Sequence, residues 1–120
     1  MEMMFDPNDP SLLDAVAALG ALAQTHRLGV FRQLVQAGHC GLPAGVLAER
    51  LSVPRSSLSF HLSNLKSAGL VHERREGRSI IYSANFGAMR DLITYLLRNC
   101  CEGDSVEAQL VQELTKGTPQ

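Results

Sequence analysis

The stretch that decides the fold is PAGVLAERLSVPRSSLSFHLSNLKSAGLVHERREGRSIIYSA, residues 43–84. Its first part predicts two short helices, at 43–51 and 55–68, separated by the linker Ser52-Val53-Pro54. Pro43 suits a first helical position, and Gly69 suits the C-terminal end of the second helix. Two short helices joined by such a linker form a helix-turn-helix, which we assign to residues 43–68. Leucines at helical spacing supply the faces that pack the pair: Leu47, Leu51, Leu58, Leu62 and Leu65.

A β-hairpin is predicted directly after the helix-turn-helix. The runs LVHERR and SIIYSA are rich in strand-forming residues and are separated by Glu76-Gly77-Arg78, a glycine turn with a basic tip. Residues 70–84 are therefore expected to form a wing. The fold class that follows is mainly α with a small β-hairpin, a winged helix-turn-helix.

Apolar residues at helical spacing also flank this unit on both sides. They predict a helix at about 11–23 after the capping candidate Ser11, a second helix from Thr25 to the glycine of AGHCG, and a long helix at 85–101 capped by Asn85. The last helix carries one apolar stripe, which continues to Cys100 and Cys101: Met89, Leu92, Ile93, Leu96 and Leu97. Residues 11–37 and 85–101 carry more apolar surface than the core of one chain can bury, so we expect them to form a two-fold dimer. The remaining residues, 102–120, form a tail, in which Ser105 to Thr115 is weakly amphipathic and could add a short helix.

Length and composition place the chain among globular proteins of one domain, 1–120. It has 120 residues, of which 45% are hydrophobic and 19% are charged. No apolar run approaches a membrane span, and the N-terminus lacks the pattern of a secretory signal, so a cytoplasmic location is expected. The sequence contains no nucleotide-binding loop, HExxH motif or nucleophile elbow, and an enzyme is not expected.

The net charge of −1 conceals one basic segment. Residues 55–78 contain five Arg or Lys and two Glu, a local charge of +3, whereas the segments on either side are acidic. A basic helix-turn-helix and wing predict a local contact with DNA. Ser56 could instead cap its helix, His61 could simply be surface, and the wing arginines could be only solvated. The candidate contacts on the second helix and the wing are Arg55, Ser56, Ser57, Ser59, Phe60, His61, Asn64, Arg74, Arg75 and Arg78.

Several strings resemble the ArsR/SmtB family of bacterial metalloregulatory repressors. QTHRLGVFRQL resembles the family signature on the second helix, LAERLSVPRSSLSFHLSNLKSAGLV its helix-turn-helix, and RREGRSIIYSA its wing. The resemblance covers about residues 11–101. It implies a homodimer that binds operator DNA, expected to be palindromic, and leaves it when a metal, metalloid or oxidant binds.

The adjacent cysteines at 100 and 101 are the candidate sensor. Thiolates select soft metals and metalloids, and the predicted last helix has no histidine, so zinc is not expected. The chain resembles arsenic-responsive members of the family that carry a cysteine pair at the end of the final helix. This implies trivalent arsenic as inducer, as arsenite or as a methyl or phenyl arsenical, with antimonite following by the same chemistry.

The third position on the arsenic is open. It could be filled by carbon in an organoarsenical, by a small ligand, or by Cys40, which could equally be a plain small residue. The alternative is a thiol-redox or persulfide-responsive repressor in which Cys40 pairs with Cys100 or Cys101.

Overall fold

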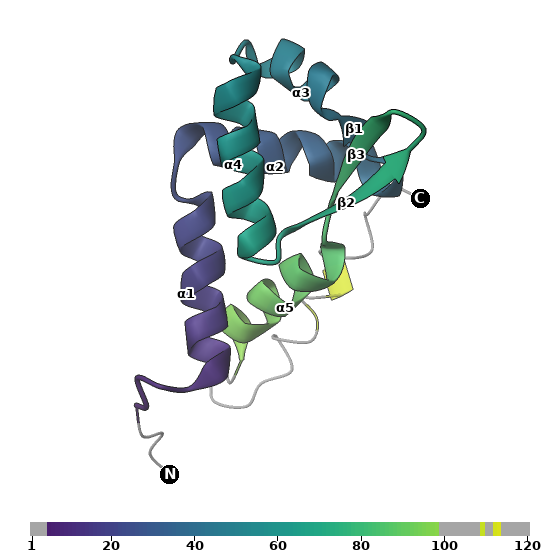
Figure 1. Ribbon diagram of the computed structural model, residues 1–120. Helices are drawn as coiled ribbons and strands as arrows, with labels where there is room; N and C mark the ends of the chain where they lie inside the picture. The colour runs from purple at the N-terminus through teal and green to yellow at the C-terminus, as the bar shows by residue number, and fades with distance from the viewer. Residues whose placement is uncertain (1–4, 99–108, 110–111, 114–120) are drawn as a thin grey trace.

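The computed structural model describes residues 5–98 together with residues 109, 112 and 113 of the tail, and these three are helical. The elements follow in the order α1 (Pro10–Leu22), α2 (Thr25–Ala37), the 3₁₀ turn η1 (Gly38–Cys40), β1 (Leu42–Pro43), α3 (Ala44–Leu51), α4 (Arg55–Ser67), β2 (Val71–Glu76), β3 (Ser79–Ala84) and α5 (Phe86–Leu97). This is the predicted winged helix-turn-helix, mainly helical with a small antiparallel sheet (Figure 1).

The end of α4 is fixed by a Schellman motif. Gly69 has a φ of 78°, and its backbone N–H donates to the carbonyl of Lys66 while that of Leu70 donates to Leu65. Both bonds satisfy carbonyls that the helix end would leave unpaired. The predicted role of Gly69 is confirmed, and the motif turns the chain directly into β2.

The wing is a three-stranded sheet rather than a hairpin alone. β2 and β3 pair antiparallel from Val71↔Ala84 to Glu76↔Ser79, with Gly77 and Arg78 at the turn. On the other edge of β3, the two-residue strand β1 pairs Leu42 with Tyr82. β1 was not predicted from the sequence, since a strand of two residues has no periodicity. Pro43 accordingly ends this strand and is the N-cap residue of α3 instead of its first helical residue.

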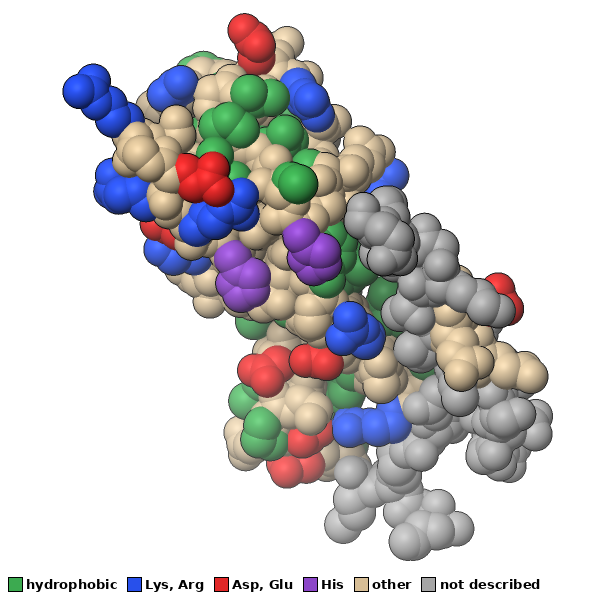
Figure 2. Space-filling model, turned by 90° about the vertical axis from the view of Figure 1, so that its right-hand side faces the viewer, with side chains coloured by type: hydrophobic (Ala, Val, Ile, Leu, Met, Phe, Trp, Pro, Cys, Tyr) green, Lys and Arg blue, Asp and Glu red, His purple; other side chains and the backbone are tan. Residues whose placement is uncertain are grey.

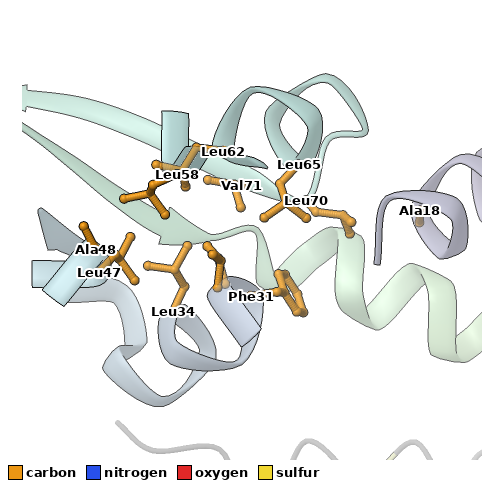
Figure 3. Packing of buried hydrophobic residues seen from close by; sticks show 12 residues of the cluster. Ala18, Phe31, Leu34, Leu47, Ala48, Leu58, Leu62, Leu65, Leu70 and Val71 are labelled. Carbon is orange, nitrogen blue, oxygen red and sulfur yellow. The ribbon is translucent and has the colours of Figure 1, made fainter. Parts of the chain in front are cut away.

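The core lies where α2, α3, α4 and the base of the wing meet (Figure 3). The predicted core leucines Leu47, Leu58, Leu62 and Leu65 are buried, and Leu51 packs at the margin of the cluster. Each fully buried leucine contributes about 1.5–3 kcal/mol to folding. The other buried members come from neighbouring elements: Ala18, Val30, Phe31, Leu34, Ala48, Leu70, Val71 and Ala84.

The outer helices α1 and α5 differ from prediction at their ends. α1 begins at Pro10 with Asp9 as N-cap residue, so Ser11 is not the cap. Asn85 does cap α5, because its side chain accepts a hydrogen bond of 3.1 Å from the backbone N–H of Ala88. α5 ends at Leu97, because Arg98 has a non-helical ψ of 130° and its N–H donates to the carbonyl of Tyr95. The predicted residues 99–101 of this helix lie outside the described residues. Among the described residues, no helix has the length and hydrophobicity that crossing a membrane requires.

Candidate nucleic-acid interface

α4 carries two opposed rows of side chains. Leu58, Leu62 and Leu65 are buried, at spacings of four and three residues. The same spacing starting two residues earlier gives Ser56, Phe60 and Ser63, all exposed. Two residues correspond to about 200° of helical rotation, so this serine–phenylalanine row lies opposite the core. Ser63 was not among the predicted contacts, although its spacing of seven residues from Ser56 places both on one side of the helix.

The start of α4 excludes Ser56 as the cap of this helix. The helix begins at Arg55, and its N-cap residue is Pro54, which gives no side-chain cap. Ser56 is therefore inside the first turn and does not cap the helix. Ser57 and Ser59 are also exposed in this N-terminal half, the part of a recognition helix that enters the major groove.

Two of the predicted contact residues lie against neighbouring parts of the chain. The guanidinium of Arg55 lies over Gly45 of α3, so closely that a Cβ built on Gly45 would be 2.6 Å from its Nη2. The side chain of Asn64 turns back and donates a 2.9 Å hydrogen bond to the carbonyl of Phe60. The middle of the exposed face consists of the Phe60 ring with Ser56 and Ser63 on either side of it.

The wing arginines lie on two different faces of the hairpin. Arg74 donates to the Glu76 carboxylate at 2.8 Å and to the carbonyls of His39 and Cys40 at 3.4 and 2.9 Å. Arg75 is the next residue, so strand alternation puts it on the face of Glu73, whose carboxylate pairs with Lys66 of α4 at 3.0 Å. Arg75 therefore points to the α4 side, and Arg78 is exposed at the turn beside it.

The charged side chains divide the surface. Figure 2 shows most of the visible Lys and Arg side chains on the upper part of this face, with some acidic side chains among them, and other acidic side chains near hydrophobic ones below. α1 and the segment before it contribute Asp6, Asp9 and Asp14, whereas α4 and the wing form the segment of charge +3. A polyanion is therefore attracted to the α4 and wing end of the molecule.

His61 links this surface to α2. Its ring stacks on that of His26, with 5.5 Å between centroids and 15° between planes, and its Nδ1 is buried without a hydrogen-bond partner. Burial lowers the pKa of His61 below its ordinary value, and the nearby His26 and Arg27 lower it further. The folded protein thus favours neutral His61.

We expect acid to destabilise the protein through His61. The pKa of His61 is lower in the folded than in the unfolded chain. Its contribution to the free energy of unfolding is therefore fully present above about pH 6.5 and is lost as the pH drops below that value. Urea unfolding between pH 7.5 and 5.5 should show the free energy of unfolding decreasing, with a shallower decrease in His61→Gln. His72→Gln, at an exposed position of β2, is the control and should keep the wild-type slope. An equal slope in His61→Gln would contradict the assignment.

The predicted sensor cysteines lie only partly within the described chain. Cys40 ends η1 as an exposed free thiol. Cys100 and Cys101 lie outside the described residues. Within the part that the structure describes, no three His, Cys, Asp or Glu side chains are grouped to hold a metal ion.

Comparisons with known proteins agree with this geometry. A family model described as a helix-turn-helix domain matches residues 22–74. The chain is 34% identical over 64 residues to the transcriptional repressor SdpR of Bacillus subtilis, a match that covers 53% of this chain and 71% of that protein. It is 32% identical over 90 residues to the transcriptional activator HlyU of Vibrio cholerae, covering 75% and 81%.

Solved structures share the fold over most of the chain. An ArsR-like transcriptional regulator from Rhodococcus sp. RHA1 has a TM-score of 0.71 at 26% identity, covering 88% of this chain and 96% of that one. A Mycobacterium bovis domain described as a homodimeric winged helix-turn-helix DNA-binding domain has a TM-score of 0.60 at 28% identity, covering 86% and 96%. Reduced HlyU from Vibrio cholerae has a TM-score of 0.59 at 30% identity, covering 76% and 93%. The chain therefore belongs to the ArsR/SmtB family of winged helix-turn-helix, DNA-binding transcriptional regulators, a family without enzymatic activity.

Proposed function

We propose that the protein is a cytoplasmic, homodimeric repressor that holds operator DNA through α4 and the wing and releases it when trivalent arsenic binds. The observation that carries the DNA-binding part is a pair of exposed features on α4 and the wing. The serine–phenylalanine row of α4 lies opposite the core, and Arg75 points to the α4 side of the wing. One surface can then enter the major groove while the other grips the neighbouring backbone.

The dimer is supported by the outer helices. α1 exposes Leu13, Val16 and Leu19, and α5 exposes Leu96, of which Val16 and Leu96 are 56% and 59% exposed. The three residues of α1 recur every three positions and so lie along one side of the helix. A two-fold partner would remove this apolar surface from water and would place two α4 helices for a palindromic operator.

The proposed inducer is arsenite or a methyl or phenyl arsenical, bound by the thiolates of Cys100 and Cys101. Soft thiolates suit trivalent arsenic, and the pair follows Leu97 of α5 by three residues. An organic group on the arsenic would supply the third bond that two cysteines leave open. Zinc, which prefers mixed ligands that include histidine or carboxylate, is not part of the proposal.

Asn85 supplies a route from the sensor helix to the recognition helix. Its side chain caps α5 and donates a 2.8 Å hydrogen bond to the carbonyl of Gly69, and its backbone N–H donates to Leu70 at 2.8 Å. The start of α5 is thus tied to the Schellman motif that ends α4. A shift of α5 on arsenic binding would move α4, and by linkage DNA would weaken arsenic binding by the same factor.

The test is release of fluorescent operator DNA, followed by anisotropy. Arsenite, methylarsenite, phenylarsine oxide, zinc and hydrogen peroxide would be titrated in turn against the DNA complex. We expect release by the arsenicals and none by zinc. Cys100→Ser and Cys101→Ser should bind DNA as the wild type does but raise the arsenical concentration for half-release at least tenfold, while Cys40→Ser should respond normally. Undiminished release from both terminal variants would refute arsenic sensing by this pair.

A thiol-redox switch is the second candidate, and the exposed Cys40 thiol favours it. The similarity to HlyU, whose structure is described as that of the reduced protein, also motivates this test. Here hydrogen peroxide would release the DNA, Cys40→Ser would abolish the release, and mass spectrometry would detect a disulfide between Cys40 and Cys100 or Cys101. Release by peroxide that dithiothreitol reverses, without a response to arsenicals, would establish this alternative.

A further inference from the structure

Phe60 stands out on the α4 surface because a large aromatic ring is left in water. Its exposed fraction is 64%. Within residues 38–85, all of which the structure describes, it is the sole large hydrophobic side chain that is exposed. The other exposed large hydrophobic residues of the described chain lie on α1, α2, α5 and the segment before α1. The proposed dimer explains the exposed residues of α1 and α5 but does not explain the exposure of Phe60.

The position of Phe60 is the middle of the face that would enter the groove. It follows Ser56 by four residues and precedes Ser63 by three, on the side of α4 opposite Leu58 and Leu62. The neighbouring His61 ring lies 6.0 Å away between centroids and is tilted by 60°. The carbonyl of Phe60 accepts the hydrogen bond from Asn64, and the ring projects from the middle of α4.

We infer that Phe60 is a specificity-determining residue that reads the C5-methyl group of thymine in the major groove. A phenyl ring has no hydrogen-bonding group, and the thymine methyl is the one apolar group that base pairs present there. Its neighbours in the row are serines, which are short, and the guanidinium of Arg55 lies over Gly45. Phe60 is thus the side chain of this row with the reach and the chemistry for a selective base contact. The inference rests on the proposed operator binding and adds the base that is read.

A protein partner is a weaker explanation of the exposed ring. Surfaces that bind other proteins are usually contiguous apolar patches, whereas the row of Phe60 contains only serines beside it. The basic segment 55–78, to which Phe60 belongs, also favours a polyanion. A contact with a second copy of the chain remains an outcome that the experiment below detects.

The test separates the methyl group from every other property of thymine. The wild-type dimer would select its preferred duplex from a random pool, and each thymine of that site would then be replaced by deoxyuridine, which lacks only the methyl. Binding would be measured by anisotropy for the wild type, Phe60→Ala, Phe60→Leu and the matched control Phe5→Ala. Phe5 is 79% exposed and lies before α1, away from the proposed interface.

We expect one thymine of each half-site to respond. Deoxyuridine at that position in one half-site should weaken wild-type binding about fourfold, from the lost transfer of one methyl group, and in both half-sites about fifteenfold. Phe60→Ala should bind more weakly and no longer distinguish the two bases, Phe60→Leu should keep part of the preference, and Phe5→Ala should keep all of it. Specific binding in which no thymine responds, or a full preference in Phe60→Ala, overturns this inference alone. A ring that instead contacts a second copy would show as loss of dimer in Phe60→Ala by sedimentation. If neither the wild type nor Phe5→Ala selects any sequence, the proposed operator binding fails as well.

Discussion

Replacing Arg75 and Arg78 together with alanine is expected to lower DNA affinity on the order of 10³-fold at 0.1 M salt. Both side chains are exposed, and Arg75 points to the α4 side of the wing. A dimer would lose four phosphate contacts, each of which releases about 0.9 counterions, so the slope of log K against log salt should become shallower by roughly 4. Anisotropy titrations from 50 to 300 mM salt would measure both quantities.

Arg74→Ala is the matched control, in the same strand and with the same loss of charge. Its guanidinium already donates to Glu76, His39 and Cys40, so we expect a lower unfolding temperature and a salt slope close to that of the wild type. The double variant removes two arginines, so half of its change in salt slope is the effect per arginine. If Arg74→Ala changed the salt slope by that amount, the division of the wing arginines between two faces would be wrong.

Gly41→Ala is expected to destabilise the fold by about 3–5 kcal/mol, from backbone strain plus steric overlap. Gly41 has a φ of 72° and a ψ of −171°, a conformation that is essentially limited to glycine. An added Cβ would collide with the backbone carbonyl of Tyr82 and come within 3.0 Å of Ile81 Cγ2. The substitution would push β1 away from β3. Urea unfolding followed by circular dichroism at fixed protein concentration would measure the loss.

Gly38→Ala separates the two causes. Gly38 has the same φ of 72° and a ψ of −158°, but an added Cβ would have no atom within 4 Å. It should therefore cost only the backbone strain, about 1–3 kcal/mol. Equal losses in the two variants would mean that the close approach of Gly41 to β3 does not contribute to stability.

The helix-turn-helix and wing were predictable because their signals are local. The leucine spacing of α4, the glycine after it and the glycine turn of the hairpin each act within a few residues. Confirmation of the Asn85 cap has the same cause, since a cap bonds to backbone three residues away. The strand β1 could not be found in this way. It exists only because β3 offers an unpaired edge to Leu42 and Pro43.

The candidate site was predicted as a set of residues but not as an arrangement. The sequence by itself determined which side chains of α4 face the core and which face outward, because helical periodicity assigns both rows. It also determined that soft thiolates stand near the end of the last predicted helix. Only the tertiary structure decided that Arg74 is tied to η1 while Arg75 points to the α4 side, and that Arg55 lies over Gly45. The partners of these side chains are distant in sequence, and contacts of that kind come from packing rather than from local pattern.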